Sequence, residues 1–337
     1  MLYPPNLEWD ATTSEVNPML IISRQTVEQM VSVEWVLEVV EAAFFEHGQL
    51  RVKMPPKLYL DLPEYDGDFR AMPAFVNGAA GLKWVNSHPK NPSRFGKPTV
   101  MAILIYNNPA TGEPLAVMDA TAITKFRTAA ATAVATRYLA DKDSKTLSII
   151  GCGAQAGPHL VYLDHVMHFE HILLYDRDTS RAQQVARSIP GKCRVVASAR
   201  EAARADVVTT ITPGNERVLS RRDITGGCHI NAIGADALGK QELDPGILLA
   251  ARVFVDDMAQ ATHSGEVSTP IHEGIYKESM IAGTLGEVVT GKVKARYGKD
   301  DITLFDSTGL AIEDIAMAKH IYEQALAQGL GLKVDLI

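Results

Sequence analysis

Four cations lie among apolar residues in the first half of the chain. They are Lys57 in MPPKLYL, Arg70 in FRAMPAF, Lys83 in GLKWVNSHP and Arg127 in TKFRTAAAT. A strand that is buried on one face seldom carries a bare charge unless that charge is paired or faces a cleft. Because few acids are near them in the sequence, the four together favour an anionic ligand, such as a carboxylate held by charge-assisted hydrogen bonds. For any one of them alone, an exposed strand position is the simpler explanation.

One acid, Asp236, lies in a loop of small residues within NAIGADALGKQELD, directly after a predicted strand. Open α/β sheets bind their ligands at the carboxyl ends of the strands. A carboxylate at such a place can take up and return protons, so Asp236 is our candidate general acid/base. The alternative is that Asp236 only shapes an Asx-type turn.

The segment LSIIGCGAQAGPHL has the pattern of a strand, a glycine turn and a helix. In the GxGxxA motif, Gly151 permits the tight turn and Gly153 lets a pyrophosphate approach the backbone. The small Ala156 lets the helix pack on the strand. The helix N-terminus then offers free N–H groups to the phosphates. This pattern predicts a dinucleotide site, and the alternative is a glycine turn in some other α/β protein.

The next predicted strand ends at Asp176, close to the distance along the chain at which a ribose-binding acid is expected. A carboxylate there accepts hydrogen bonds from the ribose hydroxyls and repels a 2′-phosphate, so the motif favours NAD over NADP. Arg177 and Arg181 weaken that preference because either guanidinium could reach a phosphate.

The histidines do not form a set of metal ligands. His159, His165, His168 and His171 have mixed spacing, and we expect them on the surface, whereas His88 in VNSHPKNP is a possible cleft residue. Because HExxH and comparable motifs are missing from the sequence, we predict that there is no catalytic metal.

Composition narrows the class of protein. The chain has 337 residues, of which 46% are hydrophobic and 22% charged, and its formal net charge of −7 disfavours nucleic acid as a partner. Cys152, Cys193 and Cys228 are far apart, which fits a reducing cytoplasm. No apolar run reaches the length of about 18 residues that a membrane span needs. The N-terminal stretch MLYPPNLEWDATTSEVNP lacks the features of a signal peptide, and we expect a surface arm.

The elements that must position these residues can be read from the periodicity. We expect a helix over residues 23–47, capped by Ser23 and ended by Gly48. Extended runs from Val52 to Asn107, and then the run PLAVMDA, are expected to form an antiparallel or mixed sheet. A long helix rich in alanine and threonine follows over residues 121–140. From residue 146 strands and helices alternate, which predicts a doubly wound parallel sheet. The last segment, GLAIEDIAMAKHIYEQALAQGLG, is expected to be an amphipathic helix that folds back on the first domain.

Several blocks together resemble the ornithine cyclodeaminase/mu-crystallin family. The blocks are MPPKLYLDLP, FRAMPAF, GLKWVNSHPKNP, KPTVMAILIYN, TGEPLAVMDAT, RTAAATAVA, IGCGAQA, HINAIGADALGKQELD and FDSTGLAIEDIA. They run in order from about residue 20 to the C-terminus, and within the family the chain is most similar to the alanine dehydrogenases of archaeal type. The resemblance implies a Rossmann-type doubly wound parallel sheet plus a discontinuous α+β domain for substrate binding and dimerisation. The corresponding boundaries are 1–128 for substrate binding and dimerisation, 129–305 for NAD binding, and 306–337 for a segment that returns to the first domain.

The resemblance also implies roles for individual residues. Asp236 corresponds to the family's proton donor and acceptor, and Lys83 joins it as a catalytic residue. The substrate-binding set is Lys57, Arg70, Lys83, Arg127 and Thr308. The cofactor-binding set is Thr99, Arg127, Gly151, Gly153, Ala154, Gln155, Asp176, Thr210, Asn231, Ala232, Ile233, Lys240 and Ser307.

Arg70 separates two activities within the family. Ornithine cyclodeaminases have a glutamate at this place, which can pair with the distal ammonium of ornithine, whereas an arginine repels that ammonium. Two unit charges about 4 Å apart interact by roughly 4 kcal/mol at an effective dielectric constant of about 20, and even a quarter of that disfavours a cationic side chain about fivefold.

We therefore predict an NAD-dependent oxidative deamination of a small L-amino acid, with L-alanine giving pyruvate and ammonia, by a cytoplasmic homodimer. The alternatives are an ornithine cyclodeaminase that makes L-proline, and a mu-crystallin-like nucleotide-dependent binding protein or imine reductase. A pure binding protein has no need of an acid/base such as Asp236.

Overall fold

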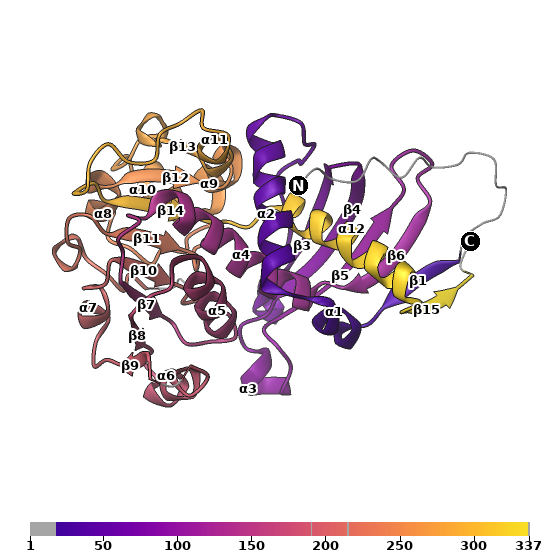
Figure 1. Cartoon of the computed structure of the whole chain (residues 1–337), viewed down its shortest axis with the longest axis horizontal. Coiled ribbons are helices and arrows are strands. Elements are labelled where there is room, and N and C mark those ends of the chain that lie inside the picture. The colour runs from indigo at the N-terminus through magenta and orange to yellow at the C-terminus, as the bar shows by residue number, and fades with distance from the viewer. Residues whose placement is uncertain (1–17, 190, 214–215, 336–337) are drawn as a thin grey trace.

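The computed structural model describes residues 18–189, 191–213 and 216–335, so nearly all of the expected N-terminal arm lies outside the described residues. Two sheets lie side by side, and the helices α2 (Val33–Gly48) and α4 (Thr121–Leu139) stand between them (Figure 1). The expected domain boundary at residue 128 falls inside α4, and the division into domains stays a prediction.

The first sheet has seven strands in the order β15-β1-β6-β5-β4-β3-β2. The strands are β1 (Met19–Ile22), β2 (Leu58–Leu62), β3 (Gly67–Val76), β4 (Ala79–Ser87), β5 (Val100–Asn107), β6 (Pro114–Asp119) and β15 (Leu332–Val334). Within the described part of the chain, β1 and β6 are the only neighbours in this sheet that pair in parallel, so the sheet is mixed. The short helices η1 (Pro63–Tyr65) and α3 (Asn91–Phe95) connect β2 to β3 and β4 to β5.

The second sheet has eight parallel strands in the order β13-β12-β14-β11-β10-β7-β8-β9. They are β7 (Thr146–Ile150), β8 (His171–Tyr175), β9 (Cys193–Val195), β10 (Val207–Thr210), β11 (His229–Ala232), β12 (Arg252–Val255), β13 (Gly283–Thr284) and β14 (Thr303–Asp306). The chain turns first to one side of β7 and then to the other, which makes this a doubly wound sheet. The predicted fold class is confirmed.

The first expected helix is in fact two helices. Ser23 caps α1 (Arg24–Met30) by accepting a hydrogen bond from the Thr26 N–H, as predicted. The backbone is then extended at Val31 and Ser32, where a second helix begins. The Trp35 indole donates to the free Met30 carbonyl across this break. Apolar periodicity continues through the break, so the periodicity alone did not reveal it.

Small residues make α4 a helix that packs on all sides. Thr128, Thr132 and Thr136 each donate a hydroxyl hydrogen bond to the carbonyl four residues earlier, so their polar groups are satisfied inside the protein. The helix packs against α2 and against α5 (Ala156–Met167), which follows the glycine turn. The prediction that His159 is a surface residue is wrong, because His159 on α5 is fully buried against α4.

The remaining helices cover the second sheet or return to the first. They are α6 (Thr179–Ala186), α7 (Ala199–Ala202), η2 (Arg221–Asp223), α8 (Pro245–Ala250), α9 (Met258–Ser264), α10 (Ser268–His272), η3 (Glu278–Met280), α11 (Leu285–Val289) and α12 (Ala311–Gln328). The last of these, α12, packs against α2, β3 and β4 of the first lobe (Figure 1). None of the helices in the described ranges is long and apolar enough to cross a membrane.

Candidate functional site

The glycine turn lies between β7 and α5, where the sheet order reverses. Gly151 has φ +103°, and a Cβ on it would lie 2.6 Å from the Ile211 carbonyl oxygen, so the turn needs glycine. A Cβ on Gly153 would meet no atom within 4 Å, so the backbone there is open to an approaching group. Ala154 and Gln155 complete the turn, and α5 begins at Ala156. An open backbone at the start of a helix of 12 residues fits the pyrophosphate of a dinucleotide.

Asp176 follows β8 and is tied to that turn. One carboxylate oxygen accepts a hydrogen bond from the Cys152 N–H at 2.7 Å, and the other accepts from the Asp178 N–H at 2.8 Å. A carboxylate offers about four acceptor positions, so two remain for ribose hydroxyls. The neighbouring cations have acidic partners, because Arg177 pairs with Glu216 and Arg181 with Asp178.

Other predicted cofactor residues lie in a row at the carboxyl ends of the central strands. Thr210, Ala232 and Asp306 are aligned across β10, β11 and β14, and the Ser307 N–H donates to the Ala232 carbonyl at 3.0 Å. Ile233 follows in the same row and donates its N–H to the Thr210 carbonyl. This is the edge at which doubly wound sheets bind ligands.

Two side chains in this row face inward. The Asn231 amide donates to the hydroxyls of Thr136 and Thr209, and its oxygen lies 3.0 Å from the His229 ring. The Thr210 hydroxyl donates to the carboxylate of Glu242. The expected cofactor contacts of Asn231 and Thr210 stay predictions. Because both side chains are already hydrogen-bonded inside the protein, we expect their backbone groups to make these contacts.

Thr99 precedes β5 in the other lobe. Its carbonyl accepts hydrogen bonds from the His88 N–H and from the Asn86 side chain. The His88 ring lies edge-on against Phe69 and 2.9 Å from the Asn86 amide, so local contacts account for its position. The cofactor contact of Thr99 stays a prediction.

The structure brings the four predicted cations together but corrects one premise about them. Lys57 interacts electrostatically with Arg70 and Arg127, and Lys83 does so with Arg127 and Lys57. The expectation that few acids lie nearby is wrong, because Asp314 pairs with Lys83. The other acidic partners are Asp68 and Asp236 for Arg70, and Glu313 and Asp314 for Arg127. A buried cation needs a counter-charge, and segments distant along the chain supply it in every pair except that of Arg70 with Asp68, two residues earlier.

Asp236 stands between two cations. One carboxylate oxygen lies 2.8 Å from Arg70 Nη1, and the other lies 2.6 Å from Lys240 Nζ. Burial favours the neutral acid, but the charges of Lys240 and Arg70 outweigh it and hold the pKa of Asp236 well below its usual range. The side chain is 36% exposed. Lys240, expected beside the cofactor, thus pairs with the candidate acid/base in this structure.

Lys57 is the cation with a neutral partner. Its ammonium donates to the Thr308 carbonyl, while the Thr308 N–H donates to the Asp256 carboxylate at 2.6 Å. Burial, and to a smaller degree the nearby charge of Arg70, lowers the pKa of Lys57 to about 8. Lys57 interacts electrostatically with both Asp236 and Lys83, so it lies near both of the predicted catalytic residues.

Lys83 is the most buried of the four cations. It is 1% exposed, and its ammonium lies 2.6 Å from Asp314 and 3.3 Å from the Thr124 hydroxyl. Burial lowers its pKa to about 8, against the opposing effect of Asp314. A direct contact of Lys83 with a ligand stays a prediction.

Sequence reasoning missed the buried acids of the site. Asp256 follows β12 directly and accepts hydrogen bonds from the Thr308 and Gly309 N–H groups, while Glu313 and Asp314 lie in the first turn of α12. The adjacent pair of acids in GLAIEDIA, directly after FDST, was the signal available. An acidic first turn is also common in helices for reasons of the helix dipole, so the signal is weak.

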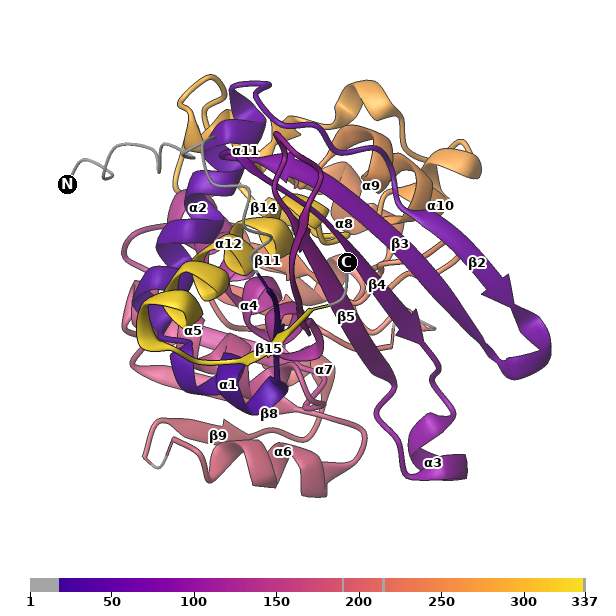
Figure 2. The ribbon, with the colours of Figure 1, turned by 90° about the vertical axis from the view of Figure 1, so that its right-hand side faces the viewer.

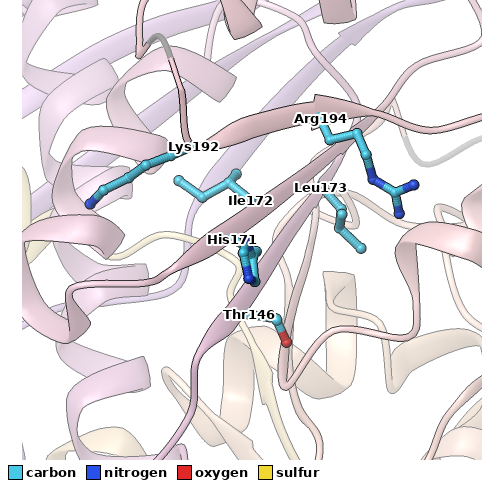
Figure 3. Close-up of a pocket in the computed structure, with 6 residues that line it drawn as sticks. All are labelled: Thr146, His171, Ile172, Leu173, Lys192 and Arg194. Carbon is cyan, nitrogen blue, oxygen red and sulfur yellow. The ribbon is translucent and has the colours of Figure 1, made fainter.

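A shallow cavity of about 360 Å³ lies elsewhere (Figure 3). It is lined by Thr146, His171, Ile172, Leu173, Lys192 and Arg194. Thr146 and His171 are the first residues of β7 and β8, so this cavity is at the amino edge of the sheet, opposite the glycine turn. Within the ranges that the structure describes, no group of three or more His, Cys, Asp or Glu side chains could hold a metal ion.

Comparison with known proteins gives consistent matches. The ornithine cyclodeaminase/mu-crystallin family matches residues 17–329. The chain is 45% identical over 317 residues to an alanine dehydrogenase of Archaeoglobus fulgidus, covering 94% of this chain and 98% of that protein. It is similar to a solved archaeal alanine dehydrogenase dimer with bound NAD, with TM-score 0.92, 44% identity and coverage of 95% and 99%. It is also similar to the Δ1-pyrroline-2-carboxylate reductase of Thermococcus litoralis in complex with NADH and L-proline, with TM-score 0.91, 36% identity and coverage of 94% and 100%.

Proposed function

The chain belongs to the ornithine cyclodeaminase/mu-crystallin family, and from that premise we propose that it is an NAD-dependent dehydrogenase of a small L-amino acid, with L-alanine as its substrate. The observation that carries the proposal is the arrangement of four cations and Asp236 around the carboxyl edge of a sheet whose glycine turn fits a dinucleotide. The products are pyruvate, ammonia and NADH.

The cations and Asp236 divide the work between them. NAD, held by the open backbone at Gly153 and by Asp176, would supply the hydride acceptor for the substrate Cα. Lys57 and Arg70 hold the substrate carboxylate, and Lys83 and Arg127 support them from the buried side. Asp236 takes a proton from the substrate amine and passes it to solvent. It then takes a proton from the water that attacks the imine carbon, and returns this proton to the amine of the adduct as the C–N bond breaks. Ammonia leaves, and loss of the remaining hydroxyl proton gives the 2-oxo acid.

The contact between Arg70 and Asp236 connects binding with proton transfer. In this structure Arg70 lowers the pKa of Asp236, which makes a poor base. A substrate carboxylate that takes over Arg70 removes one of the two cations from Asp236. The pKa of Asp236 then rises toward the range in which a general base is effective.

Two observations rank the alternatives. Arg70 forms an ion pair with the side chain of the proposed acid/base, Asp236. Its positive charge repels the distal ammonium of ornithine, which disfavours a cyclodeaminase. A protein that only binds a nucleotide and a ligand has no need of Asp236. A reductase of cyclic imines is the second candidate, because a relative of TM-score 0.91 was solved with NADH and L-proline.

A substrate panel separates these activities. Purified protein with NAD and L-alanine is expected to form NADH and pyruvate, with weaker NADH formation from L-proline. Proline formed from ornithine, with no NADH from alanine, would reverse the ranking. Absence of turnover with every amino and imino acid, together with tight NADH binding, would indicate a binding protein.

Asp236→Asn tests the acid/base role directly. The amide keeps the size of the side chain but cannot accept a proton, so we expect kcat for alanine to fall about 10²–10⁴-fold. NADH affinity, measured by fluorescence titration, is expected to stay within about threefold because the glycine turn is untouched. Unchanged kcat would remove Asp236 from the mechanism.

We further propose a homodimer that forms through the outer face of the seven-stranded sheet. Leu58, Ala71, Trp84 and Ile103 are paired across β2, β3, β4 and β5, so their side chains share one face. Leu58 and Ile103 are 63% and 51% exposed. Figure 2 looks onto these strands directly. A contiguous apolar face of this kind marks an interface, and a related structure is a dimer.

The expected compartment is part of the same proposal. Cys152, Cys193 and Cys228 are free thiols in the structure. Free cysteines fit a reducing cytoplasm, where NAD and amino acids are also available. The acidic net charge of −7 argues against nucleic acid as a partner.

A further inference from the structure

Glu242 is a buried carboxylate that the proposed mechanism does not use. One of its oxygens accepts hydrogen bonds from the Thr212 N–H and hydroxyl, both at 2.7 Å. The other accepts from the Thr210 hydroxyl at 2.7 Å and the Gly234 N–H at 2.8 Å. Four donors, from the last residue of β10 and from the segments that follow β10 and β11, therefore converge on one fully buried side chain.

These bonds close the base of the loop that carries Asp236. The loop runs from Gly234 to Glu242, and its two ends are joined by the hydrogen bond between the Gly234 N–H and the Glu242 carboxylate. A Cβ on Gly234 would lie 2.5 Å from Glu242 Cδ and would also overlap the Thr212 carbonyl oxygen. The close approach of the carboxylate thus explains the glycine at this position.

The backbone of Glu242 is itself anchored. The N–H groups of Glu242 and Leu243 donate to the buried carboxylate of Glu266, at 2.9 Å and 2.8 Å. The Glu266 N–H in turn donates to Asp306 at the end of β14. The base of the loop is therefore attached to the central strands of the sheet by this chain of hydrogen bonds.

The tip of the loop reaches the other lobe. Asp236 pairs there with Arg70 on β3, and Lys240 of the same loop binds the second oxygen of Asp236. A fixed base determines where this tip can stand. Displacement of a reacting group by about 1 Å can reduce turnover about 10²-fold.

We propose that Glu242 is the positioning residue for Asp236, because it clamps the base of the 234–242 loop and so sets the reach of the proposed acid/base. The inference rests on the proposed function of Asp236. Glu242 itself lies inside the protein and acts on the reaction only through the loop.

Glu242→Gln is the test, because the amide keeps the size of the side chain but its nitrogen cannot accept hydrogen bonds. We expect kcat for alanine to fall about 10- to 100-fold, whereas the KM for alanine changes less than about threefold because the carboxylate-binding cations stand on other elements. NADH affinity is expected to stay within about threefold. Gly234→Ala, which displaces the same carboxylate, should reproduce this pattern and serves if Glu242→Gln does not fold.

A double-mutant cycle separates positioning from a general structural effect. In an Asp236→Asn background, Glu242→Gln is expected to change kcat less than about twofold, because the group that it positions is already lost. Asp206→Asn is the control for the loss of a carboxylate that accepts the same kinds of hydrogen bond at an exposed position. Its carboxylate also accepts from two N–H groups and a threonine hydroxyl, those of Lys145 and Thr146, but at the amino edge of the sheet. That variant should keep kcat whatever it does to the thermal midpoint.

The outcomes distinguish the two proposals. An equal loss of kcat from Glu242→Gln in both backgrounds, or a loss confined to NADH affinity and thermal stability, would overturn the positioning role and leave Asp236 in place. Full turnover of Asp236→Asn alone would overturn the proposed function on which the inference rests.

Discussion

At the residue scale, Lys57 combines a charge, partial burial and a neutral hydrogen-bond acceptor. Its partner, the neutral Thr308 carbonyl, forms a weaker hydrogen bond with an ammonium than a carboxylate does. A substrate carboxylate is therefore the better acceptor for Lys57. Burial lowers the pKa of Lys57 to about 8. The ammonium is therefore charged below pH 8 and loses its proton as the pH rises through that value.

Carboxylate binding should follow this titration. Propionate, which has no amine to titrate, is expected to bind with a constant Kd below about pH 7.5, and its Kd should rise up to about tenfold per pH unit above pH 8. Calorimetry over this range measures it. Lys57→Arg keeps its charge throughout and should flatten the rise. An identical pH dependence in both proteins would show that the rise in Kd comes from another group, such as Lys83, whose pKa is also lowered to about 8.

Asp176 determines cofactor choice in our proposal. Asp176→Ala removes the acceptor for the ribose hydroxyls and the repulsion of a 2′-phosphate, so the ratio of kcat/KM for NAD to that for NADP should fall at least about tenfold. Asp164, near the end of α5, pairs with Lys192 away from the glycine turn, so Asp164→Ala is the control for a general loss of negative charge. A similar fall in both variants would contradict a specific contact of Asp176 with ribose.

At the element scale, the packing of α4 against α5 contains a buried histidine. The ring nitrogens of His159 lie 3.1 Å from the Thr132 hydroxyl and 2.8 Å from the Gln155 carbonyl oxygen. Burial lowers the pKa of His159 to about 4. Since an unfolded histidine titrates near 6.5, the unfolded chain binds the proton between about pH 6.5 and 4 and the folded chain does not.

Stability should therefore decline on the acid side. The contribution of His159 is fully present above about pH 6.5 and is lost as the pH falls toward 4, at a rate of up to about 1.4 kcal/mol per pH unit. Urea unfolding at several pH values measures it. His159→Gln cannot take up the proton, so the free energy of unfolding of this variant should fall less steeply over the same range. Parallel curves would exclude His159 as the source.

At the scale of the whole molecule, the register of the first sheet assigns its two faces to different tasks. Arg70 and Lys83 are on the covered face, and Lys83 pairs there with Asp314 of α12. Trp84 and Ile103 are on the opposite, exposed face. Because side chains alternate along a strand, the same strands can present the cations inward and an apolar surface outward.

Charge on the outer face should separate the proposed dimer. Ile103→Asp puts a carboxylate in the middle of this face, and sedimentation is expected to show a shift from dimer to monomer, because an unpaired charge is costly to bury. Val161→Asp is the control, since Val161 is an exposed apolar residue of the other lobe, on α5. A dimer that survives Ile103→Asp but not Val161→Asp would place the interface on the lobe that carries α5 and would contradict the proposal.

Sequence alone determined the features that depend on neighbouring residues. The glycine turn at Gly151, the alternation of strands and helices that follows it, and the cap at Ser23 were all predictable, because steric limits on the backbone and the period of apolar residues act over a few positions. The same locality explains an error. The break at Ser32 leaves the apolar period intact, so only the structure revealed it.

Tertiary structure decided which charges meet. Lys83 and Asp314 are 231 residues apart, and Arg70 and Asp236 are 166 apart. No local pattern encodes such pairs, because an ion pair depends on distance in space and on burial from water. Glu242 shows the same limit: its four donors come from segments that meet only when β10 and β11 lie side by side in the folded sheet.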